Sequence, residues 1–260
     1  MVDFENKTIR LSDHWRLDGL PSMCNIVIDG GGVYGVHFPE GDGGGVLSLK
    51  NVTLKNIKHL WIHPGAAIEW IDIDGLAIID SLSGLRIDAP SIGGGRIRNV
   101  SIKNLSSGGK VAGLWLGCNS DQQPELPPIT VHGFNASDIE TTGGKECHAL
   151  TSFAQPIHLS EFDIRRVRGG NASEAVYTKS SYNTFSNGTI AESDGQGALA
   201  LKGRGVGQYA EGNTVMPSVE IINDKAMWVQ SDKNIIRAKT TGRIKEHKTL
   251  ASDNFIEPSH

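Results

Sequence analysis

The chain repeats one short phrase along its length: a polar residue, often asparagine, then alternating polar and apolar residues, then a turn. Successive copies lie roughly 19 to 37 residues apart, a period in the range of solenoid proteins. Because the apolar residues alternate over short stretches, the repeat predicts strands and not helices. The copies are Asn25–Ile28, Asn51–Leu54, Trp70–Ile73, Asn99–Ile102, Asn135–Ile139, Phe162–Ile164, Asn187–Ile190, Asn213–Val215 and Asn234–Ile236.

We therefore expect an all-β fold, a right-handed parallel β-helix of roughly eight to ten coils. Glycine and asparagine clusters separate the expected strands, and both residues tolerate the left-handed backbone geometry that sharp corners require. Asn25, Asn51, Asn99 and Asn187 each lie three residues before the last apolar residue of their copy. This spacing predicts a ladder of side-chain amides at one corner of successive coils.

The 260 residues are expected to form one domain, because a solenoid grows along its axis. The prediction is a β-helix with an N-terminal cap over residues 1–240 and a polar C-terminal cap or tail over 241–260. The formal net charge is −4 with both signs scattered, which argues against a nucleic-acid or membrane partner. No signal peptide or membrane-spanning segment is recognised, so the expected location is cytoplasmic or virion-associated.

The densest group of chemically active side chains lies between residues 171 and 215. Residues about one coil apart in a parallel β-helix lie side by side, at the strand spacing of roughly 4.8 Å. Lys179, Lys202 and Arg204 are separated by about one coil. We expect these cations to converge on one face of the molecule.

Three phrases in this region resemble the chondroitinase B and alginate lyase group, polysaccharide lyase family six, whose members are pectin-lyase-like parallel β-helices. The resemblance covers about a sixth of the chain. The matching residues are Glu174, Lys179, Ser180 and Asn183 in the first phrase, Gln196, Gly197 and Lys202 in the second, and Gly212 and Asn213 in the third.

The resemblance implies cleavage of an acidic polysaccharide by β-elimination, with Lys179 as the base and Lys202 or Arg204 as its cationic partner. It also implies a calcium ion at Glu174 that holds the substrate carboxylate. Removing a proton beside a carboxylate builds up negative charge, which a fixed cation or metal must stabilise. Two positions depart from the family pattern: Ala172 replaces a second acid, and Lys202 replaces an arginine.

Four residues are candidates for substrate binding. Asn183, Tyr182 and Gln196 lie within or beside the matching phrases. Trp115 could stack its ring on a sugar if it faces outward, but its leucine neighbours leave open whether it faces solvent or core.

A second class of function stays open: a non-catalytic glycan-binding or structural β-helix, such as a component of a phage tail spike. A homotrimer would favour this reading, and a monomer would favour the enzyme. Asp138 and Asp163 are a further candidate pair, for hydrolysis by two carboxylates on facing coils. The pairs His59 with His63 and His148 with His158 lack a third ligand and are interpreted as surface or packing residues.

Overall fold

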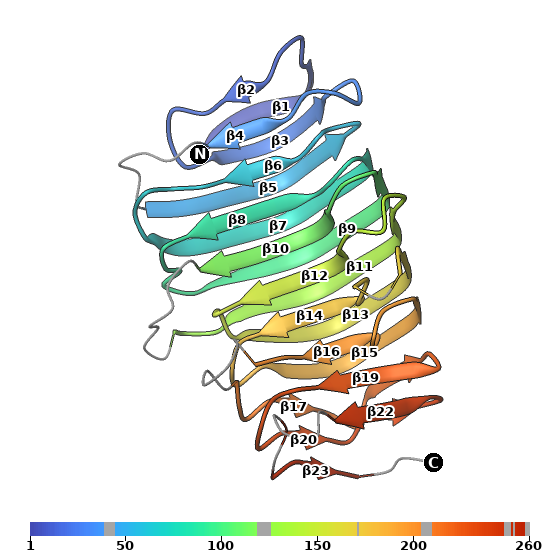
Figure 1. Ribbon diagram of the computed structural model, residues 1–260. Coiled ribbons are helices and arrows are strands. Elements are labelled where there is room, and N and C mark those ends of the chain that lie inside the picture. The colour runs from blue at the N-terminus through green and yellow to red at the C-terminus, as the bar shows by residue number, and fades with distance from the viewer. Residues whose placement is uncertain are drawn as a thin grey trace.

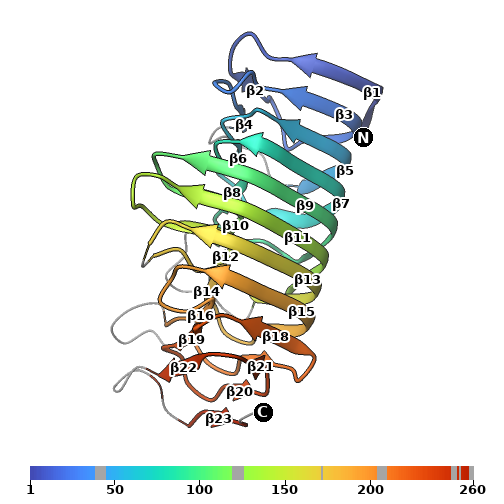
Figure 2. The ribbon, with the colours of Figure 1, turned by 90° about the vertical axis from the view of Figure 1, so that its right-hand side faces the viewer.

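Two long parallel sheets make up the computed structural model, which describes residues 1–38, 45–118, 126–170, 172–203, 210–246, 251 and 253–257 (Figures 1 and 2). Sheet A contains β1 (Val2–Arg10), β3 (Ser22–Asp29), β5 (Gly45–Lys55), β7 (Ile68–Ser81), β9 (Gly95–Ser107), β11 (Ile129–Thr141), β13 (Ile157–Arg168), β15 (Thr184–Ser193), β17 (Thr214–Val215), β18 (Val219–Ile222), β20 (Ile235–Ile236), β21 (Lys239–Thr240) and β23 (Phe255–Ile256). Sheet B contains β2 (Trp15–Arg16), β4 (Val36–Phe38), β6 (Leu60–Ile62), β8 (Leu85–Ala89), β10 (Val111–Cys118), β12 (Cys147–Phe153), β14 (Val176–Lys179), β16 (Leu199–Leu201), β19 (Lys225–Val229) and β22 (Arg243–Glu246).

The chain alternates between the two sheets, and every pairing within them is parallel. Each turn therefore stacks one strand of sheet B on the strand of the turn before, as the order β2 to β22 down Figure 1 shows. The predicted all-β parallel β-helix is confirmed. No helix occurs in the described part of the chain, and hence none there is long and apolar enough to cross a membrane.

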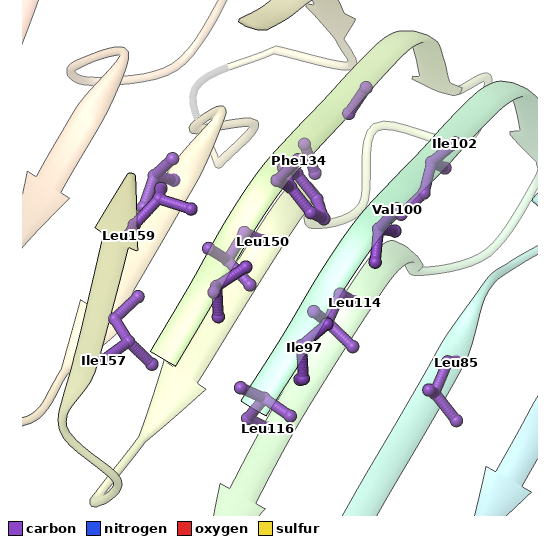
Figure 3. Close-up of a cluster of buried hydrophobic side chains, with 14 of the residues drawn as sticks. Leu85, Ile97, Val100, Ile102, Leu114, Leu116, Phe134, Leu150, Ile157 and Leu159 are labelled. Atoms are coloured by element: carbon purple, nitrogen blue, oxygen red, sulfur yellow. The ribbon is translucent and has the colours of Figure 1, made fainter. Parts of the chain in front are cut away.

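The core consists mostly of aliphatic side chains, with a few phenylalanines such as Phe134, stacked between the sheets (Figure 3). In sheet A, Ile73, Ile97, Val131 and Leu159 occupy consecutive coils at one register and are buried. Burial of apolar area contributes about 25 cal/mol per Å² to folding, so each added coil strengthens the whole stack. The facing column in sheet B runs through Val36, Leu60, Leu85, Leu114, Leu150, Val176, Leu199 and Met227.

The long strands of sheet A bend at residues with positive φ. Asn25, Asn51, Asn99 and Asn187 have φ between 51° and 54°, the left-handed region that asparagine tolerates better than most residues. Asn51 Nδ2 donates to Asn25 Oδ1 at 3.0 Å, so the predicted amide ladder is confirmed for this pair. Elsewhere the corner differs: Asn99 Nδ2 donates to an aspartate, and Gly133 follows in the next coil.

The register departs from the spacing of the sequence copies in the longest coil. Ile102 and Ile139 are the last apolar residues of consecutive copies, so the repeat predicts that they lie side by side. In the structure Ile139 pairs with Leu105 and Val167, and Ile102 pairs with Ala136, so this predicted alignment is wrong by three residues. The alternation of apolar residues continues past the bend, so more than one residue can be taken as the last apolar residue of a copy.

A second asparagine ladder lies inside the C-terminal coils. Asn183, Asn213 and Asn234 are fully buried, and each passes a side-chain hydrogen bond of 2.7 to 2.8 Å to the next, ending on Asn254. Each acceptor oxygen in the ladder also receives a backbone N–H of the preceding coil. The buried side-chain amides of the ladder are thereby satisfied.

The predicted boundary at residue 240 does not coincide with a break in the sheets. β22 pairs with β19, and β23 pairs with β20. The described residues after 240 therefore continue the coil.

Candidate functional site

The structure brings Lys179 and Lys202 together on the outer face of sheet B. Lys179 ends β14, Lys202 follows β16, and the backbone N–H of Lys202 donates to the Thr178 carbonyl at 2.9 Å. Their ammonium nitrogens lie 5.6 and 4.8 Å from the ring centroid of Tyr177. Both lysines thus share one aromatic ring.

Glu174 lies beneath this pair and is only 1% exposed. Its Oε1 accepts from Lys202 Nζ at 3.4 Å. Burial raises the pKa of Glu174, and the nearby Lys202 ammonium opposes that rise. The carboxylate is suited to hold Lys202 in place, because a buried charge needs a partner.

His148 closes the other side of Glu174. Its Nδ1 lies 3.0 Å from the Glu174 carbonyl oxygen, and its ring stacks on Tyr177 at 4.8 Å. Burial lowers the pKa of His148 to about 4, so the imidazole is neutral at pH 7. A carbonyl only accepts, so Nδ1 carries the proton, and the 3.6 Å approach to Glu174 Oε2 is no ion pair at this pH.

Lys179 is half-buried against Phe153 and Tyr177. Its pKa is lowered by burial first and then by the ammonium of Lys202, while Glu146 opposes the shift. A lysine with a lowered pKa is neutral in a larger fraction of molecules, and only the neutral amine can accept a proton.

The arrangement of cations over aromatic rings extends along sheet B beyond this pair. Lys110 Nζ lies 4.2 Å from the Trp115 ring centroid, and Lys245 Nζ lies 4.5 Å from that of Trp228. Arg86 lies between Trp61 and Trp115. Although the chain carries a net negative charge, this face therefore presents a row of cations, which we call the cationic row: Arg86, Lys110, Lys179, Lys202 and Lys245.

The other predicted residues lie elsewhere or play other parts. Asn183 belongs to the internal ladder and is fully buried. Trp115 is 8% exposed, and Lys110 and Arg86 lie over its ring, so the ring is not open for stacking on a sugar. Tyr182 is exposed and donates to Glu211 at 3.0 Å, and Gln196 is exposed in the bend before β16.

Arg204 lies outside the described residues. Lys202 is therefore the predicted cationic partner whose position is known.

The residues around Glu174 do not fit a calcium ion. Calcium takes six to eight oxygen ligands, usually several of them carboxylates. Glu174 is buried and already contacts an ammonium group. Within the described ranges no cluster of three or more His, Cys, Asp or Glu side chains could hold a metal.

The predicted carboxylate pair does not form. Asp163 faces Asn135 across the coils, and Asp138 pairs with Arg166 at 2.6 Å. Asp163 itself pairs with Arg165. Two carboxylates that each contact an arginine, on different registers, do not form a hydrolytic pair.

Several residues of the site were missed from the sequence. His148 and Phe153 lie 26 residues before Glu174 and Lys179, in the preceding coil. That interval is a signal in principle, since 26 residues is also the step from Ile28 to Leu54 in sheet A. The register of sheet B is needed to use it.

No protein-family model, no curated protein and no solved structure matches the chain. The resemblance to polysaccharide lyase family six thus depends on the motif residues alone. Of these, Glu174, Lys179 and Lys202 meet at one place, while Ser180, Asn183 and Asn213 belong to the buried ladder region.

Proposed function

We propose that the protein binds an acidic polysaccharide along the outer face of sheet B and cleaves it by β-elimination. The substrate would be a polymer containing uronate residues. The observation that carries the proposal is the contact of Lys179 and Lys202 with one ring, beside a buried glutamate.

In the proposed reaction, the neutral amine of Lys179 takes the proton from the carbon beside the uronate carboxylate. The electron pair left on that carbon delocalises into the carboxylate, where the ammonium of Lys202 neutralises the developing charge. The pair then forms the carbon–carbon double bond as the glycosidic C–O bond breaks. The leaving oxygen takes a proton from the Lys179 ammonium or from water.

Glu174 would act as a positioning residue in this scheme. Its carboxylate lies 3.4 Å from Lys202 Nζ and holds that side chain in place. The two lysines would thus have different roles, with Lys202 as the cation beside the developing charge and Lys179, whose pKa is lowered, as the base.

The test is ultraviolet absorbance of the unsaturated product during incubation with a panel of uronate polysaccharides, with and without calcium. We expect a rise for at least one polymer that Lys179→Ala abolishes. Lys103→Ala, an exposed lysine on sheet A, is the matched control and should leave the rise intact. Absence of product on every polymer would contradict the elimination chemistry.

A non-catalytic glycan-binding β-helix is the second candidate. The observation in its favour is the extent of the cationic row, which spans the coils from β8 to β22 and so exceeds what cleavage of one bond requires. Binding of acidic glycan without product, together with a trimeric mass in solution, would support this candidate, including a role as a tail-spike component.

A further inference from the structure

Arg86 is held by neighbouring side chains at a place away from the lysine pair. Its register neighbours on the outer face of sheet B are Trp61 in β6 and Trp115 in β10. The guanidinium carbon lies 5.5 Å from the Trp61 ring centroid and 4.9 Å from that of Trp115. The two indoles thus flank the guanidinium and restrict its motion, which lowers the entropy lost when it binds a ligand.

Asp88 fixes the orientation of this cluster from below. It is 5% exposed, and its Oδ2 accepts from Arg86 Nε at 2.5 Å and from Trp61 Nε1 at 3.0 Å. The ion pair engages Nε of Arg86. Among the described residues no hydrogen bond engages its two terminal Nη groups, and the side chain is 47% exposed.

A guanidinium held in this way can still bind an anion. The Nη groups are the donors that pair with carboxylate or sulfate oxygens. A partly buried aspartate behind the guanidinium holds it in position without closing the outer side.

The position of Arg86 relative to Lys179 suits a polymer. β8, β10, β12 and β14 are consecutive in sheet B, as they follow one another in Figure 1. Arg86 thus lies three coils from Lys179, about 14 Å at the usual strand spacing. One coil is about as tall as a pyranose residue is long, so a chain running along the helix axis would reach both.

We propose that Arg86 forms a second anionic-sugar subsite, which binds the carboxylate or sulfate group of a sugar several residues from the one at Lys179. The subsite extends the proposed function, since it takes another residue of the same acidic polymer. It makes recognition depend on chain length and on charge at a distance from the lysine pair.

The test is direct binding, measured by titration calorimetry with the Lys179→Ala protein so that no ligand is consumed. The probes are a uronate disaccharide, a uronate hexasaccharide, a sulfated neutral polysaccharide and the unsulfated parent polymer. Arg86→Gln is expected to weaken hexasaccharide binding by at least about tenfold and to leave the disaccharide unaffected. The uronate and sulfated arms show which anion the subsite takes, and the neutral parent polymer should be insensitive to the change.

Two further variants keep the test decisive. Arg96→Gln is the matched control, because Arg96 is 50% exposed and also pairs through Nε with an aspartate, but on sheet A. It should not change affinity. Arg86→Lys retains the charge and the packing but loses the planar fork, so weaker hexasaccharide binding in this folded variant supports the subsite even if Arg86→Gln unfolds.

The outcomes separate the two proposals. Equal hexasaccharide affinity in the Lys179→Ala protein with Arg86, with Arg86→Gln and with Arg86→Lys would overturn the subsite and leave the elimination proposal intact. A loss confined to the Arg86 variants, with no unsaturated product from the wild type, would support the subsite and contradict elimination. Absence of binding to every anionic probe would overturn both.

Discussion

The outer faces of the two sheets differ in what shifts the pKa values of their ionisable side chains. On sheet A, arginines pair with aspartates at the surface, as in Arg166 with Asp138, and the pKa of Asp138 is lowered to about 2 mainly by that hydrogen bond. On sheet B, burial is the first cause of the shifts, which lower the pKa of Lys179 and raise that of Glu174. The shift at Asp138 thus favours its charged form, whereas those at Lys179 and Glu174 favour their neutral forms.

This difference separates a face that supports the fold from a face suited to proton transfer. A carboxylate with a lowered pKa stays ionised over the physiological range and exchanges no proton there. A lysine with a lowered pKa moves toward the pH at which it can act as a base. The aromatic floor of sheet B supplies the burial that causes the shift.

Lys179→Ala gives the largest expected effect on activity. We expect a loss of elimination activity of at least about a hundredfold, since the variant removes the base while the coil remains. The rate of product formation measures it, and circular dichroism checks the fold. Activity of Lys179→Ala comparable to that of the wild type would show that another group acts as the base.

The buried asparagine ladder gives the largest expected effect on stability. Asn213→Ala removes the acceptor of both the backbone N–H and the Nδ2 of Asn183. Each buried group left without a partner costs about 1–3 kcal/mol, so we expect a loss of about 3 kcal/mol or more in urea unfolding.

The exposed ladder provides the contrast. Glycine at position 51 suits the positive φ of 51° at that corner. Asn51→Gly removes only a solvent-exposed hydrogen bond between side-chain amides, so stability should change little. A similar cost for Asn51→Gly and Asn213→Ala would show that the two ladders do not differ as their burial indicates.

A subtler probe addresses the coupling between the two lysines. Lys202→Gln removes a positive charge that lowers the pKa of Lys179. The pKa of Lys179 should therefore rise, and the acid limb of the kcat/KM profile should move to higher pH. An unchanged acid limb, in a variant that stays folded, would rule out the coupling.

The smallest expected effect lies on sheet A. The pKa of Asp138 is about 2 in the folded chain against 3.8 ordinarily, so its contribution to stability is present above about pH 4 and is lost as the pH falls toward 2. Because the pair is over a third exposed, solvent screening makes that contribution small. Asp138→Asn should slightly flatten the acid limb of stability, measured by thermal unfolding, and leave activity unchanged. A large loss of activity would contradict the division between the faces.

The sequence predicts the coil well and the site in part. Alternation of apolar residues is a local signal, so the strands and their stacking are accessible without a structure. Lys179 and Lys202 are also accessible, because they are 23 residues apart, close to one coil. Asn183 shows the limit of prediction from sequence. It matches the lyase motif, but it belongs to the buried ladder, and only the three-dimensional structure shows this.

The pKa shifts are harder to predict from the sequence than the positions of the lysines. The burial of Glu174 under Tyr177 and His148 requires side chains from two coils to pack together. Burial of this kind depends on which side of the strand each residue faces, and a bulge reverses that choice.

The most direct test of the division between the faces is the pH dependence of amine labelling at Lys179, followed by mass spectrometry with and without an acidic polysaccharide. We expect a labelling midpoint below the ordinary lysine pKa of 10.5, and protection of Lys179 by the polysaccharide. Lys103 on sheet A should gain no protection. A midpoint at or above the ordinary value, or equal protection of both lysines, would contradict the assignment of sheet B as the working face.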